Sequence, residues 1–130
     1  MLALWTAEYT RVVGWEVEYT DEFGAWWAGL SEAQQDRIAA TVRLLAARGP
    51  SLPFPHSSAV NGSRHQHMRE LRVQSRGNPL RIFYAFDPRR TAILLIGGDK
   101  TGNNRYEQYV PLADALYDTY LEELRAEGLI

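Results

Sequence analysis

The chain has 130 residues, of which 45% are hydrophobic, so it can bury one core, and we expect a single domain over residues 1–130 with 1–12 as an N-terminal extension. It contains no cysteine and only three histidines, which excludes disulfides and thiolate metal sites and leaves no metal or other cofactor expected. The formal net charge is −2, and no apolar run approaches the ~20 residues that span a membrane, so we expect a cytoplasmic protein.

The first half of the chain predicts one strand and two helices. Apolar and polar residues alternate over 12–19, which is typical of a half-buried strand. Thr20 or Asp21 can then cap a helix, and Ser31 can cap a second one, because Gln34 completes the capping-box pattern three residues later. The second helix ends at a Gly-Pro pair. We expect the two helices to form an amphipathic hairpin.

The second half predicts a loop, three strands and a helix. Prolines, serines and glycines over 49–62 indicate a long loop, and a glycine-rich loop is expected over 97–104. The expected strands cover 68–74, 80–86 and 91–96, and the expected helix runs from about 111 to 126. The sequence therefore predicts an α+β fold, with an antiparallel-rich sheet of about four strands, the helix hairpin on one face and an open second face. The C-terminal helix is expected to be either docked or mobile.

Positive charge is concentrated in one part of the sequence. Residues 64–105 carry nine Lys or Arg against three acids, a net charge of +6, whereas the remaining residues carry −8. Because this stretch also has the period-2 pattern of a sheet, it predicts one basic face that binds a polyanion. The alternative is that strand arginines merely solvate an open sheet face.

Two expected strands bring candidate site residues together. Their apolar residues must face the core, so Glu70, Arg72 and Arg81 should emerge on the open face, where two guanidiniums could bind successive phosphates. The glycine-rich loop should deliver Lys100 to the end of the same sheet. A structural ion pair between Glu70 and an arginine is the alternative to a role in chemistry.

The order of these elements and four short sequences resemble the RelE/ParE toxin superfamily, and within it the HigB-like (Gp49-like) toxins. The four sequences are Arg69-Glu-Leu-Arg72, Pro79-Leu-Arg-Ile-Phe-Tyr84, Ile93-Leu-Leu-Ile96 and Gly97-Gly-Asp-Lys100. The resemblance implies a RelE-like fold and the toxin of a type II toxin–antitoxin system. It further implies a ribosome-dependent endoribonuclease that cleaves mRNA without a metal, and a cognate helix-turn-helix antitoxin with which the toxin forms a hetero-oligomer.

The resemblance also implies roles for individual residues. Arg81 would clamp the scissile phosphate, Arg72 would hold it or its neighbour, and Lys100 would bind phosphate or tune a proton transfer. The general acid and base stay open, with Glu70, His67 and Tyr106 as candidates. The expected catalytic residues are Arg72, Arg81, Lys100, Glu70 and Tyr106, and the expected RNA-binding residues are Arg69, Arg76, His67, Asn103 and Arg105.

One departure from the family pattern leaves alternatives open. The loop after the third meander strand has a single lysine, Lys100, where many HigB-like toxins have a lysine-rich run. ParE-type members of the superfamily inhibit DNA gyrase without nuclease activity, and a non-enzymatic binding protein could also use a basic face. Arg72, Arg81 and Lys100 together favour RNA cleavage over these alternatives.

Overall fold

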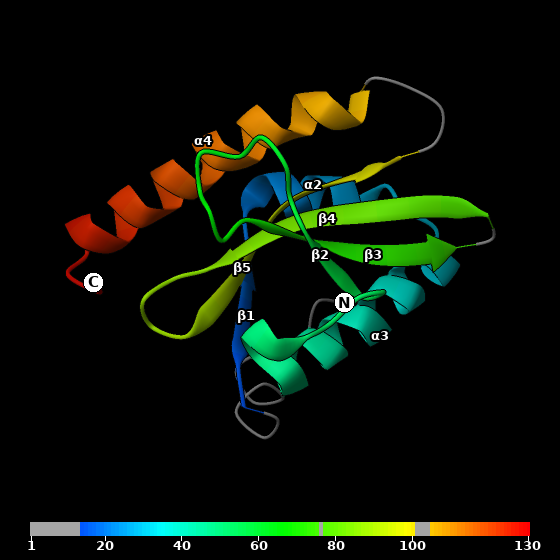
Figure 1. Cartoon of the computed structure of the whole chain (residues 1–130), viewed down its shortest axis with the longest axis horizontal. Coiled ribbons are helices and arrows are strands. Elements are labelled where there is room, and N and C mark those ends of the chain that lie inside the picture. The colour runs from blue at the N-terminus through cyan, green and yellow to red at the C-terminus, as the bar shows by residue number, and fades with distance from the viewer. Residues whose placement is uncertain (1–13, 76, 101–104) are drawn as a thin grey trace.

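A computed structural model describes residues 14–75, 77–100 and 105–130, with the side chains of 105 and 106 left out (Figure 1). Within these described residues, five strands form one sheet in the order β1-β5-β4-β3-β2, and three α-helices pack on it. The elements are β1 Glu16–Tyr19, α2 Asp21–Ala28, α3 Glu32–Arg48, the 3-10 turn η2 Gly49–Ser51, β2 Ser57–Ala59, β3 Arg69–Ser75, β4 Asn78–Phe86, β5 Thr91–Asp99 and α4 Arg105–Ala126.

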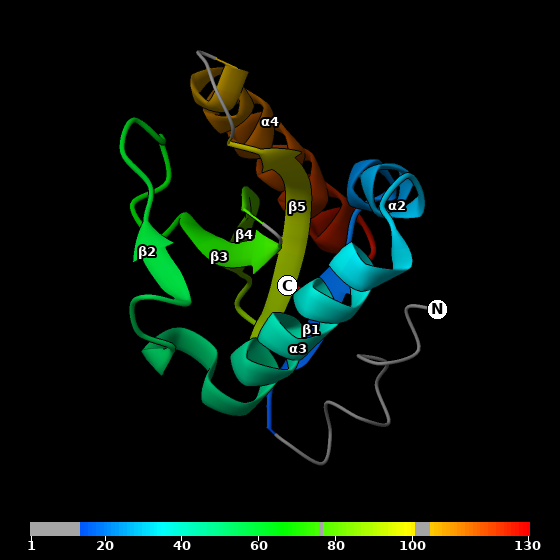
Figure 2. The same cartoon turned by 90° about the vertical axis from the view of Figure 1, so that its right-hand side faces the viewer.

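The sheet confirms the predicted α+β class and corrects its strand count. Strands β2, β3, β4 and β5 are antiparallel neighbours, whereas β1 pairs with β5 in parallel. The extra strand is β2, which lies inside the segment predicted as a loop and forms the outermost strand in Figure 2. It has only three residues, paired with residues 69–71, so the period-2 alternation was too short to be recognised.

Helix starts follow the predicted caps. The Thr20 hydroxyl accepts a hydrogen bond from the Phe23 amide at 3.0 Å, which caps α2. Ser31 and Gln34 form the predicted capping box at the start of α3, with reciprocal bonds of 3.1 and 3.0 Å. The first strand begins at Glu16, and the first two positions of the predicted strand lie outside the described residues.

Helices α2 and α3 cover one face of the sheet. Phe23 and Trp27 of α2 and the apolar stripe of α3 pack on alternate residues of the strands. The buried residues of this core include Ile38, Val42, Leu45, Leu71, Val73, Leu80, Ile82, Tyr84 and Leu94. The helix hairpin therefore packs on one face, as predicted.

The opposite face is not open, which corrects the prediction. Helix α4 lies over it, with the sheet between α4 and α3 (Figure 1). The intervening residues of the strands form a second apolar core with α4, made of Met68, Phe83, Ala85, Ile93, Leu95, Val110, Ala113 and Tyr117. The helix begins at Arg105 rather than near Pro111, because Val110 and Ala113 on both sides of that proline pack on the sheet.

The first three residues of the predicted glycine-rich loop belong to a strand instead, and residues 101–104 lie outside the described residues. Gly97 and Gly98 belong to β5, and two aromatic rings approach them from the two faces of the sheet. A Cβ at Gly97 would collide with the Trp26 ring, and a Cβ at Gly98 would lie 2.5 Å from the Tyr109 ring. These glycines allow close packing, and the sequence signal was misread as a loop.

A polar cluster helps to fix α4 on the sheet. Near its C-terminal half, Tyr120 and Arg89 bind the buried carboxylate of Asp87, with O···O and N···O distances of 2.7 and 2.9 Å. Burial raises the pKa of the Tyr120 hydroxyl, and the neighbouring Asp87 carboxylate adds to the effect. Tyr120 is therefore a neutral hydrogen-bond donor.

Among the described residues, none of the helices combines the length and the apolar character that crossing a membrane requires.

Candidate functional site

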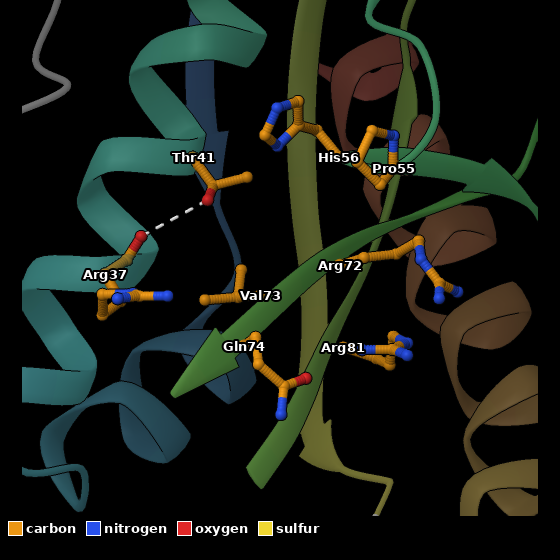
Figure 3. A pocket seen from close by; sticks show the side chains of 8 residues that line it. All are labelled: Arg37, Thr41, Pro55, His56, Arg72, Val73, Gln74 and Arg81. Carbon is orange, nitrogen blue, oxygen red and sulfur yellow. Dashed lines mark hydrogen bonds between the residues drawn. The ribbon is translucent and has the colours of Figure 1, made fainter. Parts of the chain in front are cut away.

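Arg72 and Arg81 are cross-strand neighbours at one edge of the sheet. The antiparallel register of β3 and β4 places them directly opposite each other. Figure 3 shows both guanidiniums pointing to the same side, toward α4, whereas Val73 points toward α3. The prediction that alternation brings these arginines to one face is confirmed.

Glu70 joins the two arginines. Its Oε2 accepts a hydrogen bond from the Ser58 hydroxyl at 2.7 Å and one from Arg72 Nη1 at 3.3 Å. The same oxygen lies 3.8 Å from Arg81 Nε. The Glu70 side chain is only 5% exposed, so it forms a buried ion pair with two cations rather than an open carboxylate. Ser58 lies on β2, and its contribution could not be read from a segment predicted as a loop.

Two atoms of this cluster have no hydrogen-bond partner. Arg81 Nη1 donates to the Leu80 carbonyl at 2.9 Å, but Arg81 Nε and Glu70 Oε1 are buried and unbonded among the described residues. Burial lowers the pKa of Arg81, and the charge of Arg72 lowers it further, while Glu70 opposes both. Arg81 nevertheless stays cationic at neutral pH. Unbonded buried polar atoms beside a hollow are expected where a ligand or ordered water binds.

The arginines border a hollow of about 310 Å³, which is close to the smallest size typical of small-ligand sites. It runs around the edge of β3, from the α4 side to α3 (Figure 3). Its lining residues are Arg37, Thr41, Pro55, His56, Arg72, Val73, Gln74 and Arg81. A single nucleotide is a ligand of suitable size and charge for such a hollow.

A second hollow, of about 660 Å³, brings Lys100 to Glu70. Its other walls are the last residue of β2 and the three that follow it, 59–62, and Glu107, Val110 and Pro111 of α4. Lys100 is exposed, and its amide donates to the Pro79 carbonyl at 2.8 Å, which fixes the backbone at the end of β5. Glu70 therefore stands between the lysine hollow and the arginine hollow.

The connection between β2 and β3, whose first residues line the second hollow, is fixed to α4 by a polar clasp over residues 63–65. The Ser63 hydroxyl and the Arg64 amide donate to Asp114, the latter at 2.9 Å, while the Arg64 and His65 side chains pair with Asp118. The hydrogen bonds from Arg64 and His65 lower the pKa of the Asp118 carboxyl. The clasp holds residues 63–65 against α4.

The basic stretch does not form one continuous basic face, which corrects the prediction. Arg64 pairs with Asp118, and Arg89 pairs with Asp87, in the contacts that fix α4. Arg90 lies over the Trp15 ring, 4.1 Å from its centroid. Much of the excess positive charge is thus used in separate structural pairs.

Other predicted site residues lie apart from the arginine cluster. Arg69 is on the α3 side of β3, where its Nε donates to the Ser57 hydroxyl at 2.8 Å, so it cannot share a phosphate site with Arg72. His67 is exposed in the turn before β3 and lines neither hollow. The side chains of Arg76, Asn103, Arg105 and Tyr106 lie outside the described residues.

One contact was missed from the sequence. The Arg72 guanidinium lies over the Phe54 ring, 5.0 Å from its centroid. The length of the proline-rich loop that contains Phe54 had suggested a function for the loop. No pattern in the neighbouring sequence, however, linked Phe54 to an arginine of a distant strand.

Comparisons with known proteins agree with this architecture. Residues 25–118 match the model of a family described as phage-derived protein Gp49-like. The chain is 36% identical over 114 residues to a protein of Mycobacterium tuberculosis named as the toxin HigB2, covering 85% of this chain and 56% of the relative. It is 39% identical over 105 residues to HigB3 of the same organism, covering 79% of this chain and 90% of the relative.

A solved structure shares the fold. In the crystal structure of the archaeal RelE–RelB complex from Pyrococcus horikoshii OT3, the matched chain superimposes with a TM-score of 0.51. The match covers 68% of this chain and 98% of that chain, at 13% sequence identity. This likeness shows a common arrangement of elements. The present chain spans about half the length of HigB2, one of the curated relatives it matches.

Proposed function

The chain belongs to the Gp49-like family, the HigB-like branch of the RelE/ParE toxin superfamily, and on this premise we propose that it is the toxin of a type II toxin–antitoxin system that cleaves mRNA on the ribosome. The observation that supports cleavage most is the pair of cross-strand guanidiniums, Arg72 and Arg81, held by one buried carboxylate beside a hollow of nucleotide size. We take residues 1–130 as one domain that acts in the cytoplasm.

The chemistry proposed for this site is attack by the RNA's own 2′-hydroxyl. The 2′-oxygen bonds to phosphorus, the bond to the 5′-oxygen breaks, and a 2′,3′-cyclic phosphate forms. The reaction adds negative charge to the phosphorane, which fixed cations stabilise. Arg81 would hold the scissile phosphate and Arg72 would hold it or its neighbour, because forked donors suit phosphate oxygens. No metal is needed for this step.

Glu70 fits a positioning role in this scheme. Its Oε2 is shared by Ser58, Arg72 and Arg81, and its side chain is almost fully buried. A carboxylate in this place offsets the repulsion between the two guanidiniums, so that the two like charges can lie side by side. Lys100, across Glu70 in the neighbouring hollow, would supply a further cation to the RNA backbone. The proton acceptor and donor stay open between Glu70, His67 and Tyr106.

The proposed partners are a cognate helix-turn-helix antitoxin and mRNA on the ribosome. The relatives' names and the RelE–RelB complex support an antitoxin partner. The antitoxin would bind the toxin as a hetero-oligomer, and an acidic segment would neutralise its cationic site.

The rival function is inhibition of DNA gyrase, as in ParE-type members. Both functions predict arrest of growth on induced expression, so growth alone does not separate them. Two assays do: cleavage of bulk mRNA by purified protein with ribosomes, and supercoiling by gyrase with the same protein. We expect mRNA fragments and unimpaired supercoiling. Impaired supercoiling with intact mRNA would establish the rival function. If neither mRNA cleavage nor impaired supercoiling is seen, a non-enzymatic binding protein is favoured.

A further inference from the structure

Phe54 is an exposed aromatic residue on a fixed turn. The residue is 67% exposed, the highest value among the exposed large hydrophobic residues of the described chain. The turn over 53–57 is held by the amides of His56 and Ser57, which both donate to the Pro53 carbonyl at 3.0 and 3.1 Å. The Arg72 amide donates to the His56 carbonyl at 2.9 Å, which ties the turn to β3. The structure thus holds a bare aromatic ring in a defined place.

The place is beside the phosphate-binding candidates. The Arg72 guanidinium lies 5.0 Å from the centroid of the Phe54 ring and 3.3 Å from the Glu70 carboxylate. Arg72 leaves much of Phe54 uncovered, since the residue keeps 67% of its surface exposed to solvent. The residues next to Phe54, Pro55 and His56, line the same hollow as Arg72 and Arg81. An aromatic ring in contact with Arg72 therefore lies next to the hollow that the two guanidiniums line.

We propose that Phe54 is a nucleobase platform. Resting on the proposed function, the inference is that the base next to the phosphate held by Arg72 and Arg81 stacks on the exposed face of the Phe54 ring. Proteins that bind single-stranded RNA combine cations on the backbone with aromatic rings under splayed bases. His56 and Arg37 also line the hollow, with Arg37 on its α3 side.

A protein-docking role for Phe54 fits the surroundings less well. The other exposed large hydrophobic residues, such as Tyr19, Leu44 and Leu112, belong to other elements, whereas the residues around Phe54 in the hollow are mainly polar or cationic. Protein-binding patches are usually contiguous and apolar. A lone ring beside two guanidiniums matches a nucleotide better than an apolar helix or strand.

Fluorescence of 2-aminopurine tests the platform without depending on cleavage. The probes are short RNAs, 2′-O-methylated throughout so that they are not cut, with 2-aminopurine at each position in turn. They are offered both free and in the decoding site of ribosomes. With the unmodified protein we expect quenching at one position, because stacking on an aromatic ring quenches this base. Phe54→Ala should relieve the quenching and weaken binding about fivefold to a hundredfold.

Three controls separate stacking from other roles. Phe54→Trp should retain binding and quenching, whereas Phe54→Leu, which keeps apolar area without a π face, should behave like alanine. Leu112→Ala, at an exposed leucine of α4, should change neither reading. On an RNA that lacks the base at the quenched position, the unmodified protein and Phe54→Ala should bind equally.

Several results would overturn the platform. One is an equal loss for Phe54→Ala on the abasic RNA, which would mean that Phe54 acts only by positioning Arg72. Another is full RNA binding by Phe54→Ala together with loss of binding to the cognate antitoxin. That result would mean that Phe54 is a protein-docking residue. Absence of binding by the unmodified protein in both settings would also refute it. Binding and quenching without any mRNA cleavage would instead refute the proposed function and leave the platform standing.

Discussion

The two faces of the sheet are built from alternate residues of the same strands, yet they differ in what they bury. The face under α2 and α3 buries apolar side chains from β1 to β3. The face under α4 is apolar near β5 but carries Glu70, Arg72 and Arg81 where β3 and β4 approach the edge. One face is core except near β2, where Arg69 donates to Ser57, and the other is half core and half charged site. Successive residues of one strand can therefore serve stability and function separately.

The adjacent residues Ile82 and Arg81 of β4 provide the sharpest test of this difference. Ile82 is fully buried in the core under α2 and α3. Ile82→Ala should lower the free energy of unfolding by about 2–5 kcal/mol, because a cavity replaces packed atoms. Urea denaturation followed by circular dichroism measures the loss. Leu44→Ala, at an exposed leucine of α3, should stay within about 0.5 kcal/mol. A near-neutral Ile82→Ala would contradict the account of this core.

Arg81→Ala should produce the opposite profile to Ile82→Ala. We expect the single-turnover rate of ribosome-dependent mRNA cleavage to fall about 10²- to 10³-fold, as for other removed transition-state donors. The fold should remain, since the lost contacts are one hydrogen bond to a carbonyl and a long ion pair. Arg81→Lys should recover only part of the rate, because it lacks the forked donor. Arg43→Ala on α3 is the matched control, and equal rates for both alanine variants would remove Arg81 from the site.

Glu70→Gln tests whether the carboxylate positions the arginines or acts as the base. Losing the charge from a buried pair with two cations should cost about 1–3 kcal/mol of unfolding free energy and slow cleavage. For a positioning residue, the pH dependence of the residual kcat/KM should keep its shape. Disappearance of the acidic limb of that profile in Glu70→Gln would instead identify Glu70 as the base.

The clasp between Asp118 and residues 64 and 65 should give the smallest effect, since solvent screens a pair whose side chains are 40% and 63% exposed. The pKa of Asp118 is lowered below its ordinary value of 3.8 in the folded protein. Its contribution to stability is therefore complete above that value and is lost as the pH falls through the lower pKa. Asp118→Asn should be slightly less stable than the unmodified protein at pH 7, and the difference should vanish in strong acid. A difference that persists there would assign another role to the residue.

Local signals in the sequence predicted the elements that depend on neighbouring residues. The predictions of the helix caps at Thr20 and Ser31 and of the apolar stripe of α3 were confirmed. Capping hydrogen bonds and helical periodicity both depend on residues only a few positions apart. Alternation along β3 and β4 was also enough to place Arg72 and Arg81 on one face, whereas the register that sets them directly opposite each other was not predicted. Both results follow from the period of a single element.

Features that depend on distant contacts were not predicted. Strand β2 exists because it pairs with β3, and Gly97 and Gly98 are strand residues because rings from α2 and α4 pack on them. The predicted open face was wrong, since the stripe of α4 does not reveal which face of the sheet it covers. For the same reason the sequence could not show that Ser58 and Phe54 contact the Glu70–Arg72 pair.

We propose above all that the charged cluster of Glu70, Arg72 and Arg81, on the α4 side of the sheet, directs a 2′-hydroxyl of the RNA to attack the adjacent phosphate. The most direct measurement follows two ribosome-bound mRNAs that differ only in a 2′-O-methyl group at the mapped cleavage position. We predict that the unmodified mRNA gives a 2′,3′-cyclic or 3′-phosphate end, that the blocked mRNA stays intact, and that a chelator has no effect while the ribosome's magnesium is buffered. Efficient cleavage of the blocked mRNA with a 3′-hydroxyl end would contradict the claim, because water would then be the nucleophile.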